Sequence, residues 1–91
     1  MGITIVEGSD FTVMVRRLEN VDLVKVEIYD VDNSLVAEND NIIKNDDYLI
    51  CIFKWKEYSL TPGSYIVKKY LDINGEEVVK VDTLNVEPLD L

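Results

Sequence analysis

Apolar residues recur at every second position along most of the chain, as in Phe11, Val13 and Val15. A period of two places successive side chains on opposite faces of a β-strand, so this pattern predicts strands with one buried face. β-branched residues, which favour strands, are abundant, and helical periodicity is scarce. The pattern predicts about eight short strands, over residues 3–7, 11–16, 24–29, 34–38, 41–44, 48–53, 64–73 and 76–87.

Turn-forming residues separate nearly all of these segments. Asn74-Gly75 is the clearest case, because both residues tolerate the positive φ that a two-residue type I′ turn requires. A β-hairpin is therefore predicted over residues 71–81. The segment 55–60 is the one candidate for a helical turn, since Trp55 and Tyr58 would share a face there, and we expect it to cap one end of the core.

Many short strands separated by turns predict an all-β sandwich or a small barrel. Leu60-Thr61-Pro62-Gly63-Ser64-Tyr65 favours an immunoglobulin-like antiparallel β-sandwich of seven to eight strands. In that architecture a tyrosine at the start of the penultimate strand anchors a corner through its hydroxyl, and Tyr65 is predicted to be that residue. The chain has 91 residues, which is enough for a single domain spanning residues 1–91.

The strand over residues 64–73 contains one irregularity. Alternation points Tyr65, Val67 and Leu71 into the core, but Lys69 falls on the same face. We therefore expect either a β-bulge in this strand or a lysine whose ammonium group reaches the edge of the sheet.

The composition argues against catalysis and against nucleic-acid binding. The chain has no histidine, and its four glycines are scattered, so the usual catalytic base and a glycine-rich phosphate loop are both missing from the sequence. A formal net charge of −9 opposes contact with phosphate backbones and anionic membranes, and it favours either a basic partner or simple solubility. We expect no enzyme activity, no catalytic residue and no cofactor.

Two further predictions come from short segments of the chain. The first residues do not contain a basic segment followed by a long apolar one. Neither a secretory signal nor a transmembrane helix is therefore predicted. The single cysteine, Cys51, lies in the apolar run 48–53 and is expected to be a small buried residue, not a reactive thiol.

The string Asp30-Val31-Asp32-Asn33-Ser34 resembles the opening of a calcium-binding loop. Leu35 stands where such loops need glycine, and Asn41 stands where they need a bidentate glutamate. A turn between two strands is therefore the favoured interpretation. A weak calcium site that includes Asp30 and Asp32, shared with Asp40 or Asp47, is the alternative.

Apolar residues on strand faces that are expected to be exposed to solvent indicate a surface for protein contact. If Val24, Val26 and Ile28 point inward, their neighbours in the strand point outward. In an immunoglobulin-like sheet this strand lies beside the strand over residues 64–73. The predicted interface consists of Leu23, Tyr29, Ile66 and Tyr70, with Lys25, Glu27 and Lys68 at its rim. Scattered surface apolar residues with no function are the alternative.

The order of two motifs resembles a known group of proteins. Glu7-Gly8-Ser9-Asp10-Phe11 opens the second strand, and Leu60-Thr61-Pro62-Gly63-Ser64-Tyr65 leads into the penultimate one. This arrangement is similar to the immunoglobulin-like modules of tailed-bacteriophage structural proteins, especially the N-terminal domain of phage baseplate upper proteins. The likeness spans most of the chain.

The resemblance implies a non-enzymatic accessory protein of a virion: a capsid decoration protein, a head-fibre component or a baseplate component. It implies a virion location after assembly in the cytoplasm of the host bacterium. The expected partners are other virion proteins, either the major capsid protein or a tail component, contacted through a sheet face or a strand edge. Assembly into a homo-oligomer stays open. Two other functions also stay open: a bacterial immunoglobulin-like interaction or carbohydrate-binding module, and a small acidic regulatory or inhibitory protein.

Overall fold

The computed structural model describes residues 2–90, and in this part of the chain it contains eight β-strands and no helix. The strands form two sheets, one of five strands in the order β1-β8-β7-β3-β4 and one of three strands in the order β2-β6-β5. Their bounds are β1 (Ile3–Val6), β2 (Phe11–Arg16), β3 (Val21–Tyr29), β4 (Leu35–Asn39), β5 (Ile42–Lys44), β6 (Tyr48–Phe53), β7 (Gly63–Ile73) and β8 (Glu76–Glu87). The prediction of an all-β chain is confirmed. The two-sheet arrangement is compatible with a β-sandwich.

Local turn chemistry sets the ends of the strands. Asn74 and Gly75 have φ values of 55° and 83°, and Ile73 pairs directly with Glu76, so the predicted two-residue hairpin between β7 and β8 is confirmed. The eight strands predicted from alternation all exist, with ends that differ by at most a few residues. The predicted domain bounds include residues 1 and 91, which lie outside the described residues.

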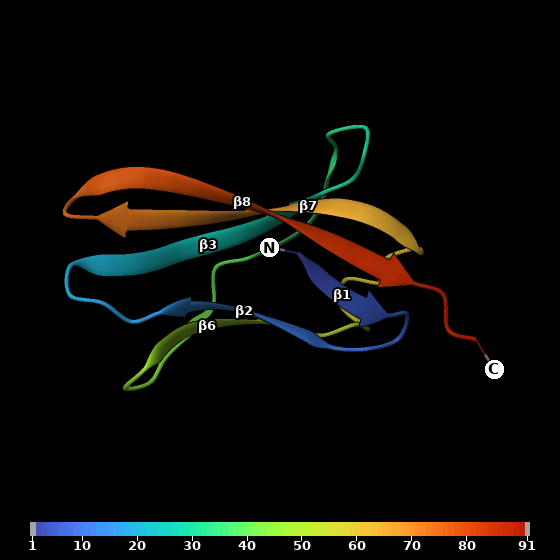
Figure 1. Cartoon of the computed structure of the whole chain (residues 1–91), viewed down its shortest axis with the longest axis horizontal. Helices are drawn as coiled ribbons and strands as arrows, with labels where there is room; N and C mark the ends of the chain where they lie inside the picture. Colours follow the sequence, from blue (N-terminus) through green and yellow to red (C-terminus); the bar gives the residue numbers. More distant parts are fainter. Residues whose placement is uncertain (1, 91) are drawn as a thin grey trace.

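The two sheets enclose one apolar core. Figure 1 shows β8, β7 and β3 in one layer and β2 and β6 in the other. The neighbouring strands pair antiparallel, except that β1 runs parallel to the C-terminal part of β8. The core consists of Phe11, Val13, Leu23, Val26, Ile28, Ala37, Leu49, Cys51, Phe53, Leu60, Tyr65, Val67, Leu71, Leu84 and Val86.

The segment after β6 covers one end of this core without forming a helix. The backbone N–H of Tyr58 donates to the carbonyl of Trp55 at 3.1 Å, which closes a single turn. Both side chains pack against the core, and the ring of Tyr58 meets the ring of Phe53 edge-on, with centroids 5.1 Å apart. The predicted capping role of this segment is therefore confirmed.

A β-bulge in β3 overturns part of the predicted pattern. Leu23 pairs with Leu71 and Lys25 with Tyr70, so Val24 is an extra residue that has no partner in β7. As a result Leu23 is buried, with 4% of its surface exposed, and Val24 is 51% exposed. The expectation that Val24 points inward and Leu23 outward is wrong. Val26 and Ile28, which follow the bulge, are fully buried as predicted.

Lys69 stays on the inner side of β7. The pairing of β7 with β8 is continuous, so β7 itself contains no bulge against that neighbour. The Lys69 ammonium group meets the Asp82 carboxylate at 2.7 Å, and both side chains are mostly buried. The ion pair compensates the positive charge of Lys69, which the alternation of β7 places on the inner side of the sheet.

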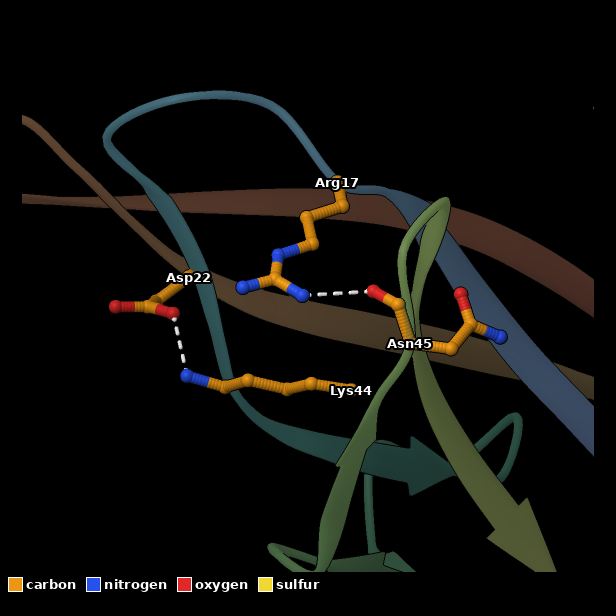
Figure 2. A network of polar contacts seen from close by, with 4 residues as sticks. All are labelled: Arg17, Asp22, Lys44 and Asn45. Atoms are coloured by element: carbon orange, nitrogen blue, oxygen red, sulfur yellow. Dashed lines mark hydrogen bonds and ion pairs between the residues drawn. The ribbon is translucent and has the colours of Figure 1, made fainter.

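Two exposed polar contacts lie at the end of the molecule where the β7–β8 hairpin is, and the one between Lys44 and Asp22 joins the two sheets. Figure 2 shows Lys44, at the end of β5, with its ammonium group 3.0 Å from a carboxylate oxygen of Asp22 in β3. In the same view the Arg17 guanidinium donates to the carbonyl of Asn45 at 2.8 Å. Because all of these groups are exposed, such contacts fix the relative position of the loops more than they stabilise the fold.

Candidate functional site

Side chains on the outer surface of the five-stranded sheet form the candidate site, which we call the large-sheet face. It comprises Lys25, Glu27 and Tyr29 of β3, Leu35 of β4, Ile66, Lys68 and Tyr70 of β7, and Val79 and Val81 of β8. β3 and β7 are neighbours, as the sequence predicted, and Tyr29 lies opposite Ile66. The structure therefore brings together Tyr29, Ile66 and Tyr70 from the predicted interface. It does not bring Leu23 to this face, because the bulge turns Leu23 into the core.

Glu27 is the centre of the large-sheet face. Although it points away from the core, only 7% of its surface is exposed. The Tyr29 hydroxyl donates to its Oε1 at 2.8 Å, and the Lys25 ammonium group lies 3.5 Å from its Oε2. A hydrogen bond from the Tyr70 hydroxyl also reaches the carboxylate. The carboxylate is thus surrounded by donors that come from two adjacent strands.

Two lysines cover the faces of the two tyrosine rings. The Lys25 ammonium nitrogen lies 4.7 Å from the centroid of the Tyr70 ring, and that of Lys68 lies 4.4 Å from the centroid of the Tyr29 ring. Both distances fall within the range of attraction between a cation and an aromatic ring. The rings are therefore held in place from above by the lysines and at their hydroxyls by Glu27.

This network shifts the pKa values of its members in a consistent way. The hydrogen bond from Tyr70 lowers the pKa of Glu27; burial opposes this shift, and Tyr29 and Lys25 add to it. The pKa of Tyr70 is raised, mainly by its hydrogen bond to the Glu27 carboxylate and next by desolvation. The same two causes, in the same order, raise the pKa of Tyr29. At neutral pH the network therefore holds one ionised carboxylate and two neutral phenols.

We expect the network to stabilise the fold in a pH-dependent way. Because the pKa of Glu27 is lower in the folded chain than in the unfolded chain, its contribution is present above about pH 5 and is lost as the pH falls below about 4. Urea unfolding of the wild type and of Glu27→Gln, between about pH 3 and about pH 7, measures this contribution. The stability difference between the two proteins should shrink toward low pH. A difference that stays constant across this range would contradict the expected shift.

Exposed apolar residues extend the face beyond the predicted residues. Val81 is 60% exposed and lies opposite Lys68, and Val79 lies opposite Tyr70. On the other side, Leu35 in β4 is exposed and lies opposite Tyr29. These three residues were not part of the interface predicted from the sequence. Period-two alternation in 76–87 was the available signal, since it places Val79 and Val81 on one face of a strand that pairs with β7.

Tyr65 begins the buried part of β7 and makes the hydrogen bond expected of a tyrosine corner. Its hydroxyl donates to the carbonyl oxygen of Thr61 at 2.5 Å, four residues earlier in the chain. The hydroxyl oxygen of Thr61 lies 3.1 Å from the hydroxyl oxygen of Tyr65. This bond fixes the crossing of the chain from one sheet to the other.

The calcium-like string forms the turn between β3 and β4. One carboxylate oxygen of Asp30 accepts hydrogen bonds from the backbone N–H groups of Asp32 and Ser34, both at 2.9 Å. Asn33 adopts the positive φ of 62° that such a turn needs. Within residues 2–90 no group of three or more histidine, cysteine, aspartate or glutamate side chains is arranged to hold a metal ion.

Cys51 is fully buried between the sheets, as predicted. Its thiol lies 3.6 Å from the carbonyl oxygen of Asn39. Burial, with a smaller effect of Asp40, raises the pKa of the thiol to about 11. The nucleophilic thiolate form is therefore scarce at neutral pH.

Comparison of the chain with protein-family models, with curated proteins and with solved structures found no match. In the described part of the chain no helix has the length and apolar character that crossing a membrane requires.

Proposed function

We propose that this chain is a non-enzymatic accessory structural protein of a bacteriophage virion, an immunoglobulin-like module that attaches to other virion proteins through the large-sheet face. The observation that carries the proposal is a pair of short rows of apolar side chains on this face. Leu35, Tyr29 and Ile66 follow one another across β4, β3 and β7, and Tyr70 is followed by Val79 on β8. Apolar and aromatic side chains mixed with a few charged ones are typical of the core of a protein interface.

The strand order supports the immunoglobulin-like part of the proposal. In that fold strands G, F and C form the centre of one sheet, with C′ beside C, and strands B, E and D belong to the other. Here β8, β7, β3 and β4 occupy the first set of positions, and β2, β6 and β5 occupy the second. β1, at the position of strand A, pairs with β8. The corner hydrogen bond of Tyr65, at the start of the strand that corresponds to F, supports the same assignment.

The rigidity of the face supports a role in binding. Binding normally costs conformational entropy, because side chains at the interface must be immobilised. On this face Tyr29 and Tyr70 are already fixed by Glu27 and by the lysines above their rings. A partner that packs on this face therefore meets side chains that are ordered in advance.

Particles of the phage that encodes the chain provide the test. Virions purified on a density gradient should contain the chain in a fixed number of copies relative to the major capsid or tail proteins. Ile66→Glu and Val81→Glu place a charge on the face at exposed positions that take no part in the Glu27 network. Either substitution should remove the chain from the particle, because a buried unpaired charge is costly at an interface.

Val31→Glu is the matched control. Val31 is 77% exposed in the turn between β3 and β4, so this substitution adds the same charge outside the large-sheet face. Particles produced with the Val31→Glu variant should retain the chain. Thermal melting of each purified variant establishes that the fold is intact. Wild-type particles that lack the chain would overturn the virion proposal, and particles that retain both face variants would overturn the choice of face.

A further inference from the structure

The outer surface of the three-stranded sheet has a character of its own, and we call it the small-sheet face. Its residues are Thr12, Met14 and Arg16 of β2, Ile43 of β5, and Tyr48, Ile50 and Ile52 of β6. Met14 lies opposite Ile50, and Ile50 lies opposite Ile43, so one apolar row crosses all three strands. Met14 and Ile43 at the ends of this row are 51% and 45% exposed.

This face lacks the acidic residues that dominate the rest of the chain. The protein has 18 aspartates and glutamates and a formal net charge of −9, yet β2, β5 and β6 contain none of them. The only charged side chain that the face presents is Arg16. The large-sheet face, in contrast, carries Glu27 at its centre.

The charge distribution indicates which partner fits. A basic protein would be attracted to the acidic surfaces of the molecule and not to a face without acidic residues. Two copies of this chain repel each other through their net charge. They can approach with the least repulsion where acidic side chains are absent, and that is also where their apolar row is exposed.

The geometry of the row suits a contact between identical faces. In a two-fold symmetric dimer each residue meets a position on the same patch of the other copy. Consider a two-fold axis that lies between the two faces, parallel to β6 and above Ile50. The β2 edge of one copy then lies over the β5 edge of the other. Met14 of each copy then meets Ile43 of the other, and the two Ile50 side chains meet at the centre.

We propose that two copies of this chain associate through their small-sheet faces to form a weak dimer that salt strengthens. The contact is weak because three short strands offer less surface than the roughly 800 Å² per partner of a standard interface. Salt strengthens it because added ions screen the repulsion between two acidic molecules while leaving the apolar contact in place. This self-contact uses the opposite side of the molecule from the proposed virion contact and does not depend on it.

Sedimentation of the purified chain tests the proposal. We expect a monomer–dimer equilibrium between about 10 µM and about 1 mM protein, with more dimer at about 0.5 M salt than at about 0.05 M. Met14→Glu and Ile43→Glu place an acidic group at each end of the row. Each should weaken the association by at least about tenfold.

Two controls separate this contact from others. Val31→Glu adds the same charge in a turn, and Val81→Glu adds it on the large-sheet face; both should leave the dimer unchanged. A protein that stays monomeric at all these concentrations and salt levels would overturn the proposal. So would a dimer that salt weakens, or one that Val81→Glu disrupts while Met14→Glu does not. Melting curves for each variant show whether a lost dimer reflects a lost fold.

Discussion

Replacing Phe53 with alanine is expected to lower the free energy of unfolding by about 3–5 kcal/mol, the usual cost of deleting a buried aromatic ring. Phe53 is fully buried, stacks on Phe11 with ring centroids 5.0 Å apart, and meets the ring of Tyr58 edge-on. It joins β2, β6 and the turn that caps the core. Small domains have a total stability of about 5–15 kcal/mol, so this single loss removes a large share of it. Urea unfolding followed by the fluorescence of Trp55, the one tryptophan, measures the change.

Met14→Ala is the matched control, because Met14 lies on the outer side of the same strand pair. It should change the stability by no more than about 0.5 kcal/mol. If Phe53→Ala is too unstable to fold, Phe53→Leu keeps a large apolar side chain and should show a smaller loss. A loss below about 1 kcal/mol for Phe53→Ala would contradict the central position of this ring in the core.

The β-bulge in β3 leads to a second expected result. Leu23→Ala should cost about 2–5 kcal/mol, and Val24→Ala should change stability by no more than about 0.5 kcal/mol. The reason is that the bulge puts Leu23 into the core opposite Leu71 and leaves Val24 in solvent. Unfolding of the two variants under the same conditions compares them directly.

Simple alternation along the strand predicts the reverse order, with Val24 as the costly position. The pair of variants therefore distinguishes a bulged strand from a regular one. Val26→Ala is a useful third variant, because both patterns bury Val26 and both predict a substantial loss. If Val24→Ala costs more than Leu23→Ala, the bulge is not present in solution.

The two proposed contacts are compatible with each other. The large-sheet face and the small-sheet face lie on opposite outer surfaces of the two layers, with the shared core between them. A copy attached to a particle through its large-sheet face therefore keeps its small-sheet face available. On a particle that holds many copies, a weak dimer contact gains strength from the high local concentration of neighbours.

Features that depend on neighbours in the sequence were predictable from it. The strands over residues 48–53 and 76–87 follow from alternation and have the predicted bounds, and the turn at Asn74-Gly75 follows from residues that tolerate positive φ. The burial of Cys51 follows from its place in an apolar run. In each case the deciding preference is local: a side-chain period of two, or the conformational freedom of one or two residues.

Features that depend on distant residues required the tertiary structure. The exchange of Leu23 and Val24 arises from the register of β3 against β7, which no pattern within β3 specifies. The hydrogen bond from Tyr70 to Glu27 links two strands, because the same register brings Tyr70 opposite Lys25. The row of Met14, Ile50 and Ile43 exists only because β2 and β5 flank β6. That the protein consists of strands, and where they turn, could be read from the amino acids, because those preferences act over a few residues. Which side chains share a face depends on how the strands pair, because pairing is set by packing between segments far apart in the chain.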